Sequence, residues 1–227
     1  MIKISDTEYF SNDRSIRFLQ GDCNEFMAGL KDNEFDLNLS DPPYGIGVTK
    51  MNMGGRKTIK PNKIQSWDNW TPDLSWFNLC KLTADNYIIF GGNYFEWSTI
   101  YNPKLKRVVD FKKYDGIIWD KGETLLGRDF SEAEIAFTNL KNGIYKLSPN
   151  QLDRIHVTQK PIDLYRWIIQ NYTKPTDTIL DCFGGSMSNA IACHMERRNL
   201  TILELDQDYF KSALERFRIY ESQLTLF

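Results

Sequence analysis

A short polar loop, Asp41-Pro42-Pro43-Tyr44, follows an apolar run at residues 35–40 that is typical of a buried strand. The two prolines fix φ and stiffen the loop. An exocyclic amine on an aromatic ring is a poor nucleophile, because its lone pair is delocalised into the ring. The Asp41 carboxylate and the Pro42 carbonyl could accept its two N–H bonds and favour a pyramidal nitrogen, while the Tyr44 ring stacks on the base. The loop therefore predicts alkylation of an exocyclic amine, although such sequences also form ordinary turns.

A glycine turn further along the chain is a second candidate site. The apolar run 178–180 is typical of a strand, Asp181 follows it, and Gly184 and Gly185 allow the backbone to approach a ligand closely. Glu204 lies 20 residues beyond Gly184, at the end of the next apolar run. In many nucleotide-binding βαβ units an acid at this spacing binds the ribose hydroxyls. On these residues alone, a nicotinamide cofactor would fit as well.

Four ordered segments resemble the amino-group DNA methyltransferases, which use S-adenosylmethionine. The catalytic motif of that family matches residues 41–44, and other family segments match 156–161, 181–186 and Glu204. The catalytic motif precedes the cofactor motif, as in the permuted "beta" class, and the resemblance covers residues 16–218. It implies S-adenosylmethionine as the cofactor, DNA as the substrate, and direct methyl transfer without a metal.

The resemblance also implies which residues bind the cofactor. Gly184 and Gly185 would approach the methionine part of the cofactor and Glu204 would bind its ribose. Asp22 would lie near the amine of the cofactor's adenine. Thr158 and Lys160 would contact the carboxylate of the amino-acid end, although a helix cap and a surface lysine are the ordinary roles of such residues. The full predicted set is Asp22, Thr158, Lys160, Asp181, Phe183, Gly184, Gly185, Ser186 and Glu204.

Met187 departs from the family pattern Phe-x-Gly-Ser-Gly-Thr-Thr, because the chain reads Phe183-Gly184-Gly185-Ser186-Met187. A side chain there could crowd the cofactor if the family glycine has positive φ. If the helix begins at this point instead, the methionine would cost little. The sequence leaves both outcomes open.

Adenine is the predicted target base, because the cytosine-N4 relatives more often carry serine where this chain has Asp41. The amine of an adenine inside a duplex cannot reach a buried donor, so the base should flip out, at a cost of about a few kcal/mol. The alternatives are a cytosine-N4 methyltransferase and a catalytically inactive DNA-binding relative. A nicotinamide oxidoreductase is a further alternative, but it would leave the loop at 41–44 unexplained.

Basic residues without an intervening acid follow the catalytic loop. We expect residues 45–70 to form a mobile basic loop insertion that clamps the phosphates of double-stranded DNA, since long loops inside compact domains are often functional. A second basic stretch at 104–113 is equally well explained as a solvated surface. The predicted DNA-binding residues are Lys50, Arg56, Lys57, Lys60 and Lys63.

Residues 121–155 are predicted to form a small target-recognition element. Its size suggests a short DNA site, help from the basic loop, or a homodimer. A partner endonuclease and a role in restriction-modification stay open. Residues that could contact phosphates are Lys121, Arg128, Lys141 and Lys146.

The composition fits a soluble globular protein. The 227 residues fit one domain, 41% of them are hydrophobic, and 28 basic residues face 30 acidic ones, for a net charge of −2. The sequence has no stretch long enough to span a membrane and no signal-peptide core, so we expect a cytoplasmic protein. Four cysteines without CxxC spacing predict buried, reduced thiols and no metal site.

Alternating strand and helix patterns predict an α/β fold: a single Rossmann-like methyltransferase domain, residues 1–227, with a doubly wound, mostly parallel sheet. The catalytic loop and the glycine turn both follow strands, so they should meet at the carboxyl edge of the sheet. Strands are predicted at 15–20, 35–40, 86–90, 115–119, 133–138, 178–180 and 199–203, and helices up to residue 30 and at 161–172, 189–195 and 209–220.

Overall fold

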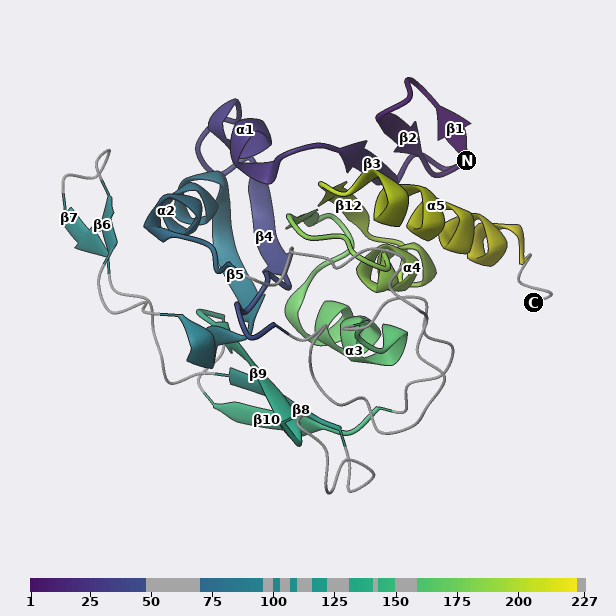
Figure 1. Ribbon diagram of the computed structural model, residues 1–227. Coiled ribbons are helices and arrows are strands. Elements are labelled where there is room, and N and C mark those ends of the chain that lie inside the picture. The colour runs from purple at the N-terminus through teal and green to yellow at the C-terminus, as the bar shows by residue number, and fades with distance from the viewer. Residues whose placement is uncertain are drawn as a thin grey trace.

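The computed structural model describes residues 1–47, 70–95, 100–102, 107–109, 116–121, 131–140, 143–149 and 159–223. In this part of the chain, a ten-stranded sheet has helices on both faces, and β6 (Ile100–Asn102) and β7 (Arg107–Val109) form a separate two-stranded sheet (Figure 1). The strand order of the large sheet is β1-β2-β3-β12-β11-β4-β5-β9-β8-β10.

The strands of the large sheet and the helices have the following bounds. The strands are β1 (Ile2–Lys3), β2 (Glu8–Phe10), β3 (Ile16–Gln20), β4 (Phe35–Ser40), β5 (Ala84–Phe90), β8 (Gly116–Asp120), β9 (Ala133–Thr138), β10 (Ile144–Leu147), β11 (Thr178–Asp181) and β12 (Asn199–Glu204). The helices are α1 (Cys23–Ala28), α2 (Leu74–Thr83), the 3₁₀ turn η3 (Gly92–Tyr94), α3 (Ile162–Tyr172), α4 (Ser188–Met195) and α5 (Gln207–Ser222).

The centre of the large sheet is parallel, and antiparallel pairs lie towards both edges. Strands β3, β12, β11, β4 and β5 run parallel to one another in that order. Strand β9 is antiparallel to both β5 and β8, and β2 is antiparallel to both β1 and β3. The predicted doubly wound, mostly parallel α/β sheet is therefore confirmed.

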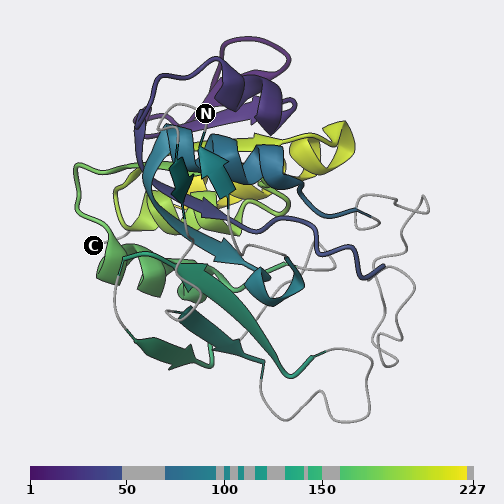
Figure 2. The same cartoon turned by 90° about the vertical axis from the view of Figure 1, so that its left-hand side faces the viewer.

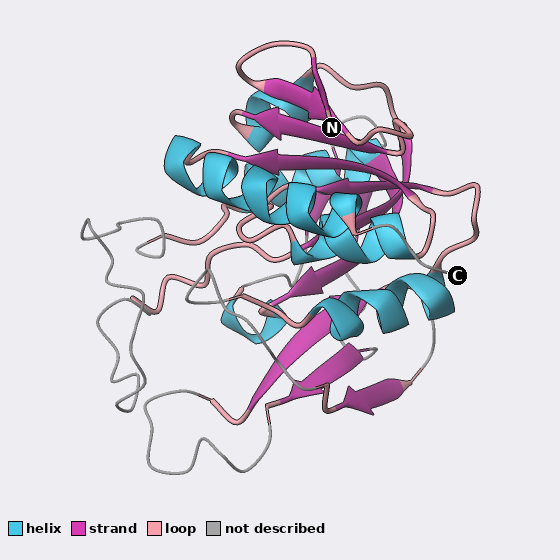
Figure 3. Cartoon of the chain, turned by 90° about the vertical axis from the view of Figure 1, so that its right-hand side faces the viewer, coloured by secondary structure: helices cyan, strands magenta, loops and turns pink. Residues whose placement is uncertain are grey.

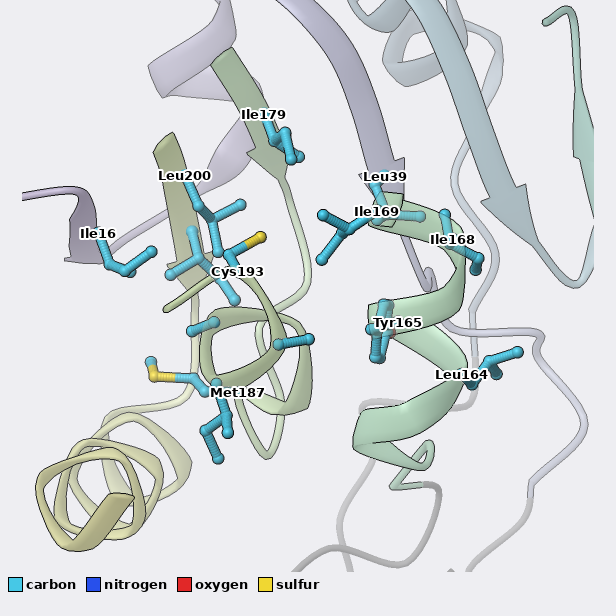
Figure 4. Close-up of a cluster of buried hydrophobic side chains, with 14 of the residues drawn as sticks. Ile16, Leu39, Leu164, Tyr165, Ile168, Ile169, Ile179, Met187, Cys193 and Leu200 are labelled. Carbon is cyan, nitrogen blue, oxygen red and sulfur yellow. The ribbon is translucent and has the colours of Figure 1, made fainter. Parts of the chain in front are cut away.

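Each face of the sheet buries its own hydrophobic core. On one face lie α1 and α2 (Figure 2), and their side chains Met27, Trp76 and Phe77 belong to the smaller core cluster. On the other face, α3, α4 and α5 lie across the strands (Figure 3), and side chains such as Ile168 and Cys193 belong to the larger cluster (Figure 4). Each large apolar side chain fully buried in this way contributes about 1.5–3 kcal/mol, so the two cores hold the sheet edge in a fixed shape.

Most predicted elements form within one or two residues of their expected ends. Pro161, expected in the first turn of a helix, is the N-cap residue of α3. The sequence patterns missed α2, η3, β1, β2, β6, β7 and β10. Strand β10 has mostly exposed side chains, so it lacks the apolar run by which the other strands were recognised.

Strands β4 and β11 are neighbours at the point where the chain reverses its direction across the sheet. From β4 the chain crosses through α2 to β5 on one side, and from β11 it crosses through α4 to β12 on the other. Ligands of doubly wound sheets bind at such a switch point, outside the carboxyl ends of the strands. The catalytic loop follows β4 and the glycine turn follows β11, so both candidate sites border this crevice.

A buried hydroxyl joins the two strands where their pairing ends. The β4–β11 register is recorded at Ile179 opposite Leu37 and Leu180 opposite Asn38. Beyond it, the Ser40 hydroxyl accepts a hydrogen bond from the Cys182 backbone N–H at 3.0 Å and donates to Asn38 Oδ1 at 2.6 Å. The end of the catalytic strand is thus tied directly to the start of the glycine turn.

Several predicted DNA-contacting positions lie outside the described residues. All five lysines and arginines of the predicted basic loop fall between residues 48 and 69, which are not described. In the predicted recognition element at 121–155, the described residues include β9 and β10, which belong to the main sheet. Lys121 and Lys146, expected near phosphates, form ion pairs with Glu134 at 2.6 Å and Asp120 at 2.8 Å.

Candidate active site

Asp41 lies at the centre of a buried ionic cluster at the carboxyl end of β4. Lys160 Nζ is 2.5 Å from Asp41 Oδ1 and 2.9 Å from Glu134 Oε2. The other Glu134 oxygen pairs with Lys121 Nζ at 2.6 Å. The Tyr44 hydroxyl donates to Asp41 Oδ1 at 2.6 Å and accepts a hydrogen bond from Lys160 Nζ at 3.1 Å. The cluster therefore balances two carboxylates with two ammonium groups.

The Tyr44 ring is fixed by aromatic and glycine neighbours. It stacks on Tyr94 with ring centroids 4.9 Å apart and planes 13° from parallel, and its edge faces Phe95 at 6.3 Å. Gly91 has φ +71°, and a Cβ at this position would overlap the Tyr44 ring. Since Tyr94 covers one face of the ring, the predicted stacking of a base on Tyr44 would have to use the other face.

Burial and nearby charges shift the pKa values of the two carboxylates of the cluster in opposite directions. Burial is the largest influence on Asp41, and with the nearby Glu134 charge it outweighs Lys160, so the pKa of Asp41 is raised. Burial opposes ionisation of Glu134 too, but Lys160 and Lys121 together overcome it and lower the pKa of Glu134 to about 2. Glu134 is therefore the permanent anion, and Asp41 is the carboxylate more ready to take a proton.

The glycine turn brings backbone N–H groups to the end of β12. Gly184 N donates to the Leu203 carbonyl at 2.6 Å, and a Cβ on Gly184 would lie 2.9 Å from that oxygen, so no larger residue fits without a shift. Gly185, at φ +49°, donates its N–H to Glu204 Oε2 at 2.7 Å. Glu204 Oε1 accepts from the Asp206 N–H at 2.8 Å. The turn and the acid at the end of β12 form one rigid unit.

Open space borders this unit on the side of the β3–α1 loop. The Gly21 N–H donates to the Glu204 carbonyl at 3.1 Å, which brings the two loops together. A Cβ on Gly21 would meet no heavy atom within 4 Å, and one on Gly185 would meet only the Phe183 carbonyl oxygen, at 4.0 Å. Neither glycine is crowded at its Cβ position, and the Glu204 carboxylate at the end of β12 is of the kind suited to ribose hydroxyls.

Asp181 and Asp22 hold the loops that border this space. Asp181 is buried and accepts hydrogen bonds from Asn189 Nδ2 at 2.9 Å and from the Phe183 N–H at 3.0 Å. Burial raises the pKa of Asp181 to about 7. Asp22 caps α1 by accepting from the Asn24 N–H at 2.7 Å. Their predicted contacts with the cofactor stay predictions.

Phe183 and Ser186 occupy the two ends of the glycine turn. The Phe183 ring packs against Trp76 at 5.4 Å between centroids, on the α2 face of the sheet. The Ser186 hydroxyl shares a hydrogen bond with Ser188 at 3.1 Å, and the buried Arg216 donates to the Ser186 carbonyl at 2.7 Å. These contacts brace the turn from both sides of the sheet.

Met187 combines a left-handed backbone with a buried side chain. Its φ is +56°, as the sequence comparison with a family glycine allowed, and it is the N-cap residue of α4. The side chain is 0% exposed and packs in the larger core cluster (Figure 4). It therefore points into the core, and the crowding of a cofactor that the sequence left open does not follow from this arrangement.

Lys160 lies with the catalytic loop in this structure. Its side chain is 2% exposed and its ammonium group contacts Asp41 and Glu134. The predicted contact with a cofactor carboxylate stays a prediction. Thr158 lies outside the described residues. The sequence analysis missed Glu134, although a lone acid in the otherwise apolar strand Ala133–Thr138 is a signal that could have found it.

Two absences hold for the described part of the chain. No helix there is long and apolar enough to cross a membrane. No cluster of three or more His, Cys, Asp or Glu side chains there could hold a metal ion.

The chain has a Rossmann-like α/β fold in which the Asp41–Tyr44 loop precedes the glycine turn along the sequence. Residues 135–215 match the model of the N6_N4_Mtase family, described as DNA methylase. The chain is 25% identical to the type II methyltransferase M2.MboI of Moraxella bovis, over 92% of this chain and 90% of that protein. It is 27% identical to the putative methylase YubD of Escherichia coli K12, over 88% and 89%. These matches confirm the resemblance to the amino-group DNA methyltransferases.

Solved structures share the fold. The M1.HpyAVI–SAM complex superposes with a TM-score of 0.57 at 23% identity and covers 89% of this chain and 98% of its own. The cytosine-N4-specific PvuII DNA methyltransferase superposes with a TM-score of 0.58 at 13% identity, over 96% of this chain and 89% of its own. At these identities the likeness concerns the fold alone, and the fold accommodates cytosine-N4 chemistry.

Proposed function

We propose that this protein is a DNA methyltransferase that transfers the methyl group of S-adenosylmethionine to the exocyclic N6 of adenine in double-stranded DNA. The observation that carries the proposal is the meeting of two loops at one switch point: the Asp41–Tyr44 loop after β4 and the Gly184–Gly185 turn, with Glu204, after β11 and β12. One loop suits an amine acceptor, and the other suits a nucleotide-containing donor.

S-adenosylmethionine is the methyl donor, and the residues around the open space fit it. The Glu204 carboxylate binds the ribose and Gly185 gives the backbone close access, while Asp22, the N-cap residue of α1, follows Gly21, whose N–H donates to the Glu204 carbonyl. When bound, the cofactor supplies an electrophilic methyl group on a positively charged sulfur. The relatives' solved structures include two described as complexes with this cofactor, which supports the assignment.

The Asp41–Tyr44 loop prepares the acceptor amine. The Asp41 carboxylate and the Pro42 carbonyl each accept an N–H bond, which localises the lone pair on nitrogen. Pro42 and Pro43 limit the movement of the loop during transfer. After the new N–C bond forms, the nitrogen carries one proton too many, and Asp41 is placed to accept it. The raised pKa of Asp41 favours that step.

The choice of adenine rests on Asp41 at the first position of the loop. The PvuII methyltransferase shows that the same fold serves cytosine N4, so the fold gives no preference. A base flipped out of the duplex would cost about a few kcal/mol, and stacking in the aromatic pocket would return about 1–3 kcal/mol. The relatives include type II methyltransferases, which supports a role in restriction-modification.

The test is transfer of a labelled methyl group from S-adenosylmethionine to mixed-sequence duplex DNA, followed by nucleoside analysis. The expected product is N6-methyladenine. Asp41→Ala should remove nearly all turnover and leave cofactor affinity within a few-fold. A product containing only N4-methylcytosine would overturn the choice of base. Cofactor and DNA binding without turnover would indicate an inactive relative instead.

A further inference from the structure

Glu134 belongs to the ionic cluster around Asp41, but it has no role in the proposed chemistry. It comes from β9, the strand that is antiparallel to β5, and its side chain is 13% exposed. Each carboxylate oxygen has its own cation, Lys121 at 2.6 Å and Lys160 at 2.9 Å. Glu134 Oε2 is also 3.2 Å from the Tyr44 hydroxyl. Glu134 is thus fully paired and lies beside Asp41, the carboxylate that takes part in the proposed reaction. Packing alone does not explain an acid at this place.

Lys160 occupies the carboxylate that the target amine needs, and Glu134 offers Lys160 another anionic partner. The ammonium has three N–H bonds, and among the described residues its acceptors are Asp41 at 2.5 Å, Glu134 at 2.9 Å and Tyr44 at 3.1 Å. Its shortest contact is with Asp41, the carboxylate that must accept the target amine. A target base therefore has to compete with a buried ammonium group for Asp41.

The surroundings of Lys160 leave it few other positions. The aromatic rings of Phe90 and Trp119 lie 4.6 Å and 5.9 Å from Nζ, and the side chain is 2% exposed. An unpaired ammonium in such a place would be strongly unfavourable, because burial removes its hydration. When the target amine takes Asp41, Lys160 needs a second anion within reach, and Glu134 already touches it.

We infer that Glu134 is a positioning residue that retains the Lys160 ammonium when the target amine occupies Asp41. This inference rests on the proposed function. Lys121 pairs with the other oxygen of Glu134. The Glu134 carboxylate is therefore held in place while Lys160 gives up its contact with Asp41. No charge enters or leaves the cluster, because the neutral amine replaces one N–H donor of Lys160 with its own.

The electrostatics of the cluster agree with this division of roles. Lys160 and Lys121 keep the pKa of Glu134 at about 2 against the effect of burial, so Glu134 stays charged at any working pH. The groups that face Asp41 are Lys160, Glu134 and the Tyr44 hydroxyl, and Asp181 adds a weaker negative charge. Removal of the Glu134 charge would therefore leave Asp41 as the one carboxylate that Lys160 contacts among the described residues, and it would lower the pKa of Asp41.

The test compares Glu134→Gln with Glu132→Gln, a matched control at an exposed position two residues earlier. Glu134→Gln should lower kcat roughly 10- to 100-fold, by analogy with residues that orient metal ligands, and leave the Kd for S-adenosylmethionine unchanged. The acidic limb of its kcat profile should move to lower pH, which a purely structural defect would not cause. Normal turnover in Glu134→Gln would overturn the inference.

A second variant separates positioning from charge imbalance. Glu134→Gln leaves Lys121 without its partner, whereas Glu134→Gln combined with Lys121→Met restores neutrality and favours folding. The inference expects the double variant to remain as slow as Glu134→Gln, because Asp41 would still be the one anionic partner of Lys160 among the described residues. Recovery of wild-type turnover in the double variant would show that the unpaired Lys121 caused the loss, and would refute the positioning role.

The fate of this inference can be distinguished from that of the proposed function. The ¹³C chemical shift of the Asp41 carboxyl group reports its titration without turnover, and its midpoint should fall in Glu134→Gln. An unchanged midpoint refutes the coupling whether or not methyl transfer occurs. A lowered midpoint in a protein that transfers no methyl group supports the coupling and counts against the proposed function alone.

Discussion

Replacement of Met187 by glycine tests how the chain tolerates a side chain where the family pattern has none. The residue has φ +56°, a region that costs an L-residue roughly 1–2 kcal/mol and glycine almost nothing. Its side chain is 0% exposed in the core beside α4. Met187→Gly therefore relieves the backbone and empties part of the core at the same time.

The loss of packing should outweigh the relief of the backbone. Truncation of a buried methionine to alanine costs about 2–5 kcal/mol, and the added freedom of the unfolded glycine chain costs about 0.4–1 kcal/mol more. Set against roughly 1–2 kcal/mol of relieved strain, the net loss in the free energy of unfolding is about 2–3 kcal/mol. For a chain of 227 residues that corresponds to a fall in Tm of roughly 5–10 °C.

Urea unfolding of the wild type, Met187→Gly and Met187→Ala measures these contributions separately. The alanine variant loses the same packing but keeps the strained backbone, so it should be less stable than the glycine variant by about 1 kcal/mol. Calorimetry should show that both bind S-adenosylmethionine within a few-fold of the wild type. A glycine variant more stable than the wild type, or one with much tighter cofactor binding, would refute this account.

Three further predictions concern the site. Tyr44→Phe should lower kcat about tenfold, because a hydrogen bond to a charged group contributes about 1.5–3 kcal/mol. Tyr44→Ala should lower kcat further, because it also removes the ring. A wild-type kcat in Tyr44→Phe would contradict this prediction. Glu204→Gln should weaken S-adenosylmethionine binding roughly 10- to 100-fold in calorimetry with little change in kcat at saturation, and an unchanged Kd would remove Glu204 from the site. Burial raises the folded-state pKa of Asp181 to about 7, above its unfolded value, so its ionisation should reduce stability as pH rises from 4 to beyond 7. Urea unfolding of Asp181→Asn should show a flatter pH dependence than the wild type, and parallel curves would contradict the assignment.

The sequence predicted the parts of the site that depend on local pattern. Apolar runs that end at Ser40 and Asp181 mark strand ends, and parallel strands place such ends at one edge of a sheet. Glycines at 184 and 185 similarly mark a turn that only small residues allow. These features depend on a few consecutive residues, so they can be predicted without knowledge of the whole fold.

Features that depend on sheet order could not be read in this way. Glu134 lies near Asp41 because β9 is next to β5 and two strands away from β4 in the sheet. The residues around Glu134 in the sequence do not indicate this strand order. The position of Lys160 follows from the same arrangement. Met187 shows a different limit: its positive φ was open to prediction from a family glycine, but the direction of its side chain depends on the packing of α4 against the core.

The Ser40 hydroxyl bridge gives the crevice a fixed width. The hydrogen bond from the Cys182 N–H to Ser40 ties the strand that carries the acceptor loop to the strand that carries the donor turn, just where their ladder stops. In a direct transfer, the reacting atoms must approach to about 3–3.5 Å, and an error of about 1 Å can cost roughly 100-fold in rate. In the proposed reaction, this one buried oxygen would help to set the distance between the acceptor loop and the donor turn. Exchange of target-recognition segments on this scaffold would leave that spacing unchanged.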